Sequence, residues 1–257
     1  MTIKLSAKEL ICIASALGVT QVFGISDPFV DVPPRKLQKE LDKVRQTLED
    51  KGVLMSDFDG NVEINPLYLP LVETVVKCDA CAVAETQCAG TTTQLMYYQK
   101  AERFVQCVVN GEELALKETT AVNASSDLSN IVNWTINPEQ LDMSPCKIPQ
   151  SLFVMLKGKS ERVRKAEIEK LNMPQEIADI LLDALRFKTN FYSLCYIDMI
   201  STGSVRSLMF IDDLNGTLKL TNIVENNKNY VLLSPVSQAE LKQAVGAFSA
   251  IMRSKES

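Results

Sequence analysis

Leu95-Met96-Tyr97-Tyr98 and Leu208-Met209-Phe210-Ile211 are the stretches that match each other best between the two halves of this 257-residue chain. Each lies in a run of residues typical of a β-strand, in which neighbouring side chains point to opposite faces of a sheet. The connections around both runs are too short for parallel crossovers, so antiparallel pairing is expected. The order of elements around each stretch is also the same. We therefore predict an internal duplication of architecture.

The first half is expected to place helices before its strands. Ser6 and Glu9 form a capping box at the start of the first helix, and Pro66 leads the last helix before the strands. Asn110-Gly111 is typical of a tight hairpin turn between two strands. A short helix over residues 126–135 is expected to close this half. The predicted strands cover residues 81–87, 91–99, 104–109 and 112–118.

The second half repeats this order after a proline-rich connection over residues 137–149. Asn215-Gly216 predicts one of its turns, and a second capping box, Ser237 with Glu240, starts its last helix. The sequence therefore predicts a single α+β domain with pseudo-two-fold repeats, residues 1–137 and 138–257. Whether the two sets of strands join into one sheet is left open. The predicted helices cover 149–157, 160–171 and 174–188, and the predicted strands cover 191–199, 204–211, 217–224 and 229–233.

The composition is that of a globular protein, with 46% hydrophobic and 23% charged residues. A net charge of -5 argues against nucleic acid, whose phosphates require clustered Lys and Arg. Charged side chains interrupt residues 1–17, so this segment does not have the apolar run of a signal peptide, and no later segment approaches the length of a membrane span. We expect a cytoplasmic protein that does not insert into a membrane.

Enzyme signatures are missing from the sequence. There is no histidine, which removes the commonest general base and the usual activator of a Ser or Cys nucleophile. Phosphate-binding loops, dinucleotide fingerprints and nucleophile elbows are also missing. We expect a protein with no catalytic residues and no cofactor. An enzyme that uses carboxylate or lysine chemistry, and a structural subunit of a larger assembly, are the alternatives.

Two short motifs resemble metal sites. Cys78 and Cys81, with Cys88 beyond them, have a metal-like or redox-like spacing, but there is no second pair, and the motif leads into a strand instead of a helix. We expect reduced, replaceable thiols and no metal. The segment 57–61 is similar to the start of a calcium loop, but Gly60 comes too early for that pattern, so a polar turn is predicted.

Several segments together resemble a known family. They combine a short strand with a Ser-x-x-Glu-Leu helix start, a helix that ends before a glycine turn and a proline, and a strand hairpin that leads through a proline into the last helix. These segments are residues 4–13, 48–54, Gly60, Pro66, 215–218, 230–235 and 237–248. The chain resembles the EspG family of type VII secretion chaperones, as a divergent member from a Gram-positive bacterium outside the mycobacteria.

The resemblance implies a pseudo-two-fold fold with a central antiparallel sheet flanked by helical bundles. It also implies a cytosolic chaperone that holds secretion substrates before export. The implied partner is a helical pair of the PE–PPE kind or a helical hairpin of the WXG or LXG kind. No contact residue of the family transfers to this sequence.

A partner-binding surface is expected on the solvent-facing side of the central sheet and at the hairpin over residues 97–104, where aromatic residues flank a charged turn. Tyr98, Lys100 and Arg103 are the predicted partner-binding residues, because interface hot spots favour Tyr and Arg. The alternative is an ordinary solvated hairpin, with helices covering both faces of the sheet. The protein is expected to be a monomer or a weak homodimer.

Overall fold

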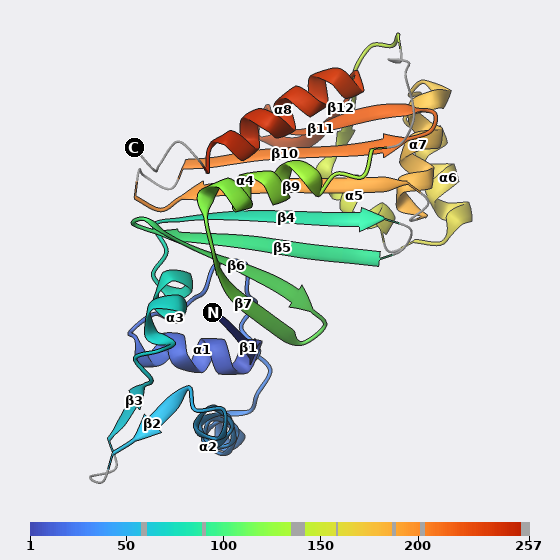
Figure 1. The fold of residues 1–257 in the computed structure, drawn as a ribbon. Coiled ribbons are helices and arrows are strands. Elements are labelled where there is room, and N and C mark those ends of the chain that lie inside the picture. The colour runs from blue at the N-terminus through green and yellow to red at the C-terminus, as the bar shows by residue number, and fades with distance from the viewer. Residues whose placement is uncertain are drawn as a thin grey trace.

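A large antiparallel sheet dominates the computed structural model, which describes residues 1–57, 61–88, 91–134, 142–157, 159–186, 189–200 and 204–252. Within these ranges the sheet has ten strands in the order β1-β7-β6-β5-β4-β9-β10-β11-β12-β8 (Figure 1). The order reads alike from both edges. From the β1 edge inward the order is β1 and then β7 to β4, and from the β8 edge inward it is β8 and then β12 to β9. The strands are β1 (Thr2–Ser6), β4 (Ala80–Cys88), β5 (Thr91–Lys100), β6 (Arg103–Asn110), β7 (Glu113–Thr119), β8 (Cys146–Pro149), β9 (Asn190–Asp198), β10 (Ser204–Asp213), β11 (Gly216–Glu225) and β12 (Lys228–Pro235).

The two sets of strands form one sheet, which the sequence had left open. β4 pairs with β9 in an antiparallel register that runs from Ala80 opposite Asp198 to Gln87 opposite Phe191. This long central pairing places the middle of the sheet at β4 and β9. The predicted antiparallel α+β architecture is confirmed.

Turn residues explain two of the hairpins. Gly111 has φ of +62° between β6 and β7, and Asn226 and Asn227 have φ of +50° and +58° between β11 and β12. Tight hairpin turns require positive φ at these positions, which Gly and Asn adopt most readily. The Asn215-Gly216 prediction was wrong by one residue, because Asp213 pairs with Gly216 and Leu214 and Asn215 make the turn.

The helices begin at recognisable caps. The Ser6 hydroxyl accepts a hydrogen bond from the Glu9 amide at 3.2 Å, and Ser237 does the same for Glu240 at 3.2 Å, so both predicted capping boxes are confirmed. The helices are α1 (Ala7–Ala16), α2 (Pro34–Asp50), α3 (Leu69–Val76), α4 (Ala121–Asn130), α5 (Gln150–Lys157), α6 (Glu161–Glu169), α7 (Gln175–Leu185) and α8 (Gln238–Ala250), and β2 (Leu54–Ser56) pairs with β3 (Val62–Ile64) in a separate hairpin.

Three boundaries differ from the predictions. The helix predicted over 126–135 is α4, which begins earlier because the Thr120 hydroxyl caps it by accepting from the Asn123 amide. α3 begins at Leu69, after Pro66. Part of the connection predicted over 137–149 is the edge strand β8, whereas residues 137–141 and the predicted repeat boundary lie outside the described residues.

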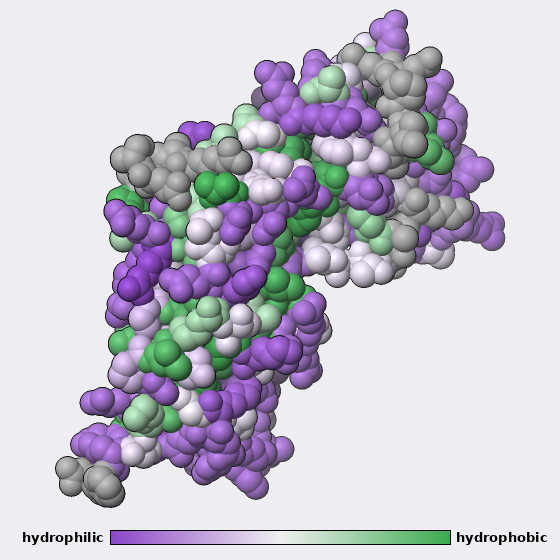
Figure 2. All heavy atoms as spheres, viewed as in Figure 1, coloured by the Kyte–Doolittle hydropathy of each residue, from purple (hydrophilic) through white to green (hydrophobic). Residues whose placement is uncertain are grey.

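Helices cover the two faces of the sheet differently (Figure 1). We call the face under α4 and α8 the front face, since these helices cross in front of the sheet in Figure 1. Figure 2 shows the molecule from the same side, with both hydrophilic and hydrophobic residues on its surface. On the back face, α1 and α3 pack on the first half, and α5, α6 and α7 pack on the second half. No helix of the described part of the chain is long and apolar enough to cross a membrane.

Candidate partner-binding site

The two faces of strand β9 differ in exposure. Tyr192, Leu194 and Tyr196 point to the front face and are at most 3% exposed, packed in the cluster under α4 and α8. The residues between them, including Cys195 and Ile197, point to the back face and are only half-buried. Successive strand residues point to opposite faces, so one strand can supply core on one side and surface on the other.

Within the described part of the chain, no helix covers the centre of the back face, because its two helical layers stand apart. Val83 packs at the margin of the cluster beneath α1 and α3, and Met209 packs at the margin of the cluster beneath α5 to α7. Neither cluster includes the residues between them. We call this strip of half-buried and exposed residues the trough. It consists of Val83, Glu85, Ser193, Cys195, Ile197, Val205 and Ser207.

One wall of the trough is the loop after α1. The Tyr98 hydroxyl donates a hydrogen bond of 2.6 Å to the Phe23 carbonyl oxygen, which ties this loop to β5. Gly24 has φ of +75°, and a Cβ at this position would lie 2.6 Å from the Met96 sulfur. Only glycine combines this backbone conformation with so close an approach to the sheet. The other wall is formed by α5 and α7.

The trough offers apolar side chains, small polar groups and the carboxylate of Glu85. Burial raises the pKa of the Cys195 thiol above its ordinary value, so the thiol stays protonated at neutral pH. A protonated thiol is a poor nucleophile and a poor metal ligand. Mixed apolar and hydroxyl surface of this kind is suited to contact with another protein surface.

The structure separates the three residues predicted to bind the partner. Tyr98 points to the back face but is fully buried beneath the loop after α1, so the expectation that its side chain meets solvent was wrong. Lys100 is half-buried and donates to the Glu73 carboxylate at 2.7 Å, and Arg103 is exposed. Lys100 and Arg103 pair at the end of the β5–β6 hairpin, and neither is one of the residues of the trough. Their part in binding stays a prediction.

Sequence patterns did not point to the trough. The run Phe191 to Ile197 has large apolar residues on both faces, so nothing in it tells which face is covered by helices. At β5, Tyr97 and Tyr98 point to opposite faces of the sheet and are both fully buried. Both faces are therefore covered at this strand, as the alternative prediction had it. The open strip lies one to three strands further on, at β4, β9 and β10.

The thiols of the Cys78–Cys81 motif have raised pKa values. Burial raises the pKa of Cys78 to about 11 and that of Cys107 to about 12, and it raises the pKa of Cys81 well above its usual value. All seven cysteines are free. Within the described ranges there is no group of three or more His, Cys, Asp or Glu side chains that could hold a metal ion.

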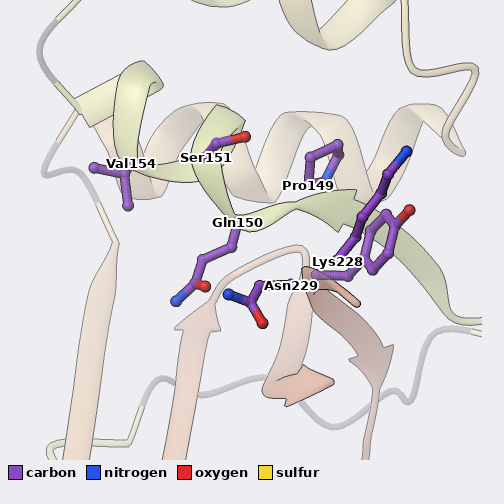
Figure 3. A pocket seen from close by; sticks show the side chains of 7 residues that line it. Pro149, Gln150, Ser151, Val154, Lys228 and Asn229 are labelled. Atoms are coloured by element: carbon purple, nitrogen blue, oxygen red, sulfur yellow. The ribbon is translucent and has the colours of Figure 1, made fainter. Parts of the chain in front are cut away.

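A hollow with a volume of about 760 Å³ lies at the edge of the sheet that β12 and β8 form (Figure 3). Gln150 at the start of α5 and Asn229 of β12 extend toward it, and Lys228 flanks it. Tyr230 is also among its lining residues. Ser151, Val154, Lys228 and Asn229 are largely exposed, so the hollow is shallow. Among its described lining residues there is no carboxylate, so this lining contains no acid and base pair for catalysis.

No protein-family model matches the chain, and no curated protein matches it in sequence. A search of solved structures found a chain in the structure of the Mycobacterium tuberculosis type VII secretion system chaperone EspG5 in complex with the PE25-PPE41 dimer. The match covers 99% of this chain and 96% of that chain, with a TM-score of 0.53 and 10% sequence identity. The fold is EspG-like. At this identity the likeness concerns the fold alone, and the EspG-like fold confirms the architecture that the sequence resemblance implied.

Proposed function

We propose that this protein is a cytoplasmic chaperone or adaptor that binds a helical substrate of a type VII secretion system before export. The observation that carries the proposal is the trough, an uncovered strip at the centre of the back face between two helical layers. The EspG-like fold supports it, because the similar structure is that of a type VII secretion chaperone bound to a PE25-PPE41 dimer.

The dimensions of the trough suit one α-helix. β4, β9 and β10 are consecutive strands, and two strand spacings amount to about 10 Å, close to the diameter of a helix with side chains. Along β9, the stretch from Phe191 to Ile197 spans about 20 Å, equal to the rise of roughly 13 helical residues. A helix laid along the strands would cover Val83, Cys195 and Ile197 together.

The finer parts of the proposal follow from the resemblance. The partner is a helical hairpin of the WXG or LXG kind or a PE–PPE-like pair, and the chaperone is a monomer or weak homodimer built from repeats 1–137 and 138–257. Exposed Arg103 and half-buried Lys100 at the β5–β6 hairpin would add contacts at the margin. A structural subunit of a secretion assembly would use the same trough for a permanent contact. That alternative predicts a complex that does not dissociate on dilution.

Two matched valine substitutions test the proposal. Val205 in the trough is 60% exposed and Val122 on α4, at the front of the molecule, is 54% exposed. Val205→Asp should weaken binding of the co-purified helical partner by about tenfold or more, because it places a charge in an apolar interface. Val122→Asp should leave binding unchanged. Equal affinities of the two variants, measured by titration calorimetry with both proteins folded, would overturn the assignment of the trough.

A further inference from the structure

The trough ends in a cavity of about 210 Å³ beneath α7. The cavity lies where Gln87 of β4 and Phe191 of β9 are paired, and Ile197 and Val205 lie at the opposite end of the trough. Its lining combines residues from α5, α7 and three central strands. These residues are Glu85, Gln87, Phe153, Leu181, Ala184, Leu185, Phe191 and Ile211.

The cavity has the size and lining for one large apolar side chain. Six of its eight lining residues are apolar, and Leu181, Leu185 and Ile211 among them are at most 6% exposed. A protein cavity of about 150 Å³ lined by similar residues holds benzene, so about 210 Å³ accommodates a phenylalanine or leucine side chain. Such a hollow beside a flat strip is a common place for the anchor residue of a partner.

A carboxylate stands at the rim of this cavity, on the side of the trough. Glu85 is exposed and lines both the cavity and the trough. Among the residues that the structure describes, no Lys or Arg makes an ion pair with Glu85. Gln87 is the other polar group of the lining. A partner helix seated here would therefore meet a negative charge next to an apolar hollow.

We infer that the cavity receives one large apolar side chain of the bound helix and that Glu85 selects a Lys or Arg three or four residues away on the same helix. Residues at this spacing are neighbours on one helix face, about 5 to 6 Å apart, so one face can present both groups. This inference rests on the proposed function and adds the chemistry that the partner must carry. Binding of this kind is the helix-in-groove mode, read as spaced anchors.

Synthetic peptides provide the test. The parent peptide is an amphipathic helix of about 20 residues with a leucine stripe, one central Phe and a Lys four residues after it. Two companion peptides replace the Phe with Ala or the Lys with Glu. Fluorescence anisotropy with the full chain should show about tenfold weaker binding for the Ala peptide and about threefold weaker binding for the Glu peptide.

Two protein variants make the result specific to this site. Glu85→Lys should reverse the preference, so that the Glu peptide binds more tightly than the parent. Ala184→Phe fills the cavity and should remove the advantage of the Phe peptide over the Ala peptide, and circular dichroism checks that both variants stay folded. If no peptide binds, or if preferences are unchanged in both variants, the inference is wrong. The proposed function is tested separately, by whether Val205→Asp weakens binding of the native partner.

Discussion

The front and back faces of β4 differ in burial. On the front face, Ala80, Ala82 and Ala84 are fully buried against the cluster of α4 and α8. On the back face, Val83 is half-buried and Glu85 is exposed. The small alanines leave room for the large side chains of β9 that pair with them and for the two helices above. Alternate residues of β4 therefore form core on one face and open surface on the other.

Truncation of neighbouring residues on β9 should give the largest contrast between the faces. Leu194→Ala removes a fully buried front-face side chain and should lower the free energy of unfolding by about 2–5 kcal/mol, because it leaves a cavity. Cys195→Ala on the back face should lower it by less than about 1 kcal/mol. Urea denaturation measures both values. Equal losses for the two variants would show that the back face is covered as tightly as the front.

The half-buried Cys78 thiol and the buried Cys81 thiol should make stability depend on alkaline pH. Burial raises the pKa of Cys78 to about 11 and that of Cys81 well above its usual value, so unfolding favours their ionisation. A raised pKa in the folded state means that the contribution to stability is complete below about pH 9 and is lost as pH rises toward 11. In this window each thiol should lower the free energy of unfolding by up to about 1.4 kcal/mol per pH unit.

The double variant Cys78→Ala/Cys81→Ala isolates this effect from the titration of tyrosines. It should lose less stability than the wild type between about pH 8 and pH 10.5, as measured by denaturation at both values. Partner binding at neutral pH should be intact, since neither thiol belongs to the trough. A wild type and a double variant with the same pH profile would show that these thiols are not buried as described.

A smaller loss of stability is expected from a change at the contact between β5 and the loop that forms one wall of the trough. Tyr98→Phe removes the hydrogen bond to the Phe23 carbonyl and should lower the free energy of unfolding by about 1 kcal/mol. Partner affinity should change less than it does in Val205→Asp, because Tyr98 does not reach the surface. A loss of affinity as large as that of Val205→Asp, without loss of stability, would restore the direct role first predicted for Tyr98.

Local signals in the sequence predicted most of the fold, because caps and turns depend on a few neighbouring residues. Ser6, Ser237 and Gly111 are examples in which one residue type decides the backbone. The edge strand β8 was missed because its four residues lie among prolines and have no pattern of their own. The strand is instead held by pairing with β12, a contact distant in sequence.

The candidate site could not be predicted in the same way. Whether Ile197 or Tyr196 faces a helix depends on where α4, α8 and the loop after α1 pack, and those positions are set by tertiary contacts. The aromatic and charged hairpin from Tyr98 to Arg103 drew attention because it has the composition of an interface. The structure places the tyrosine of that segment in the core and the open strip on other strands.

Site-specific photo-crosslinking in the native host tests most directly whether the trough holds a helical secretion substrate. A benzophenone amino acid is placed at Val205 in one strain and at Val122, the front-face control, in the other, and the cross-linked peptide is identified by mass spectrometry. Binding in the trough predicts a cross-link from position 205 to a helical segment of an exported protein and none from position 122. A cross-link to that exported protein from position 122 alone would contradict binding in the trough. The lack of any cross-link from position 205, while the exported protein still co-purifies, would also contradict it.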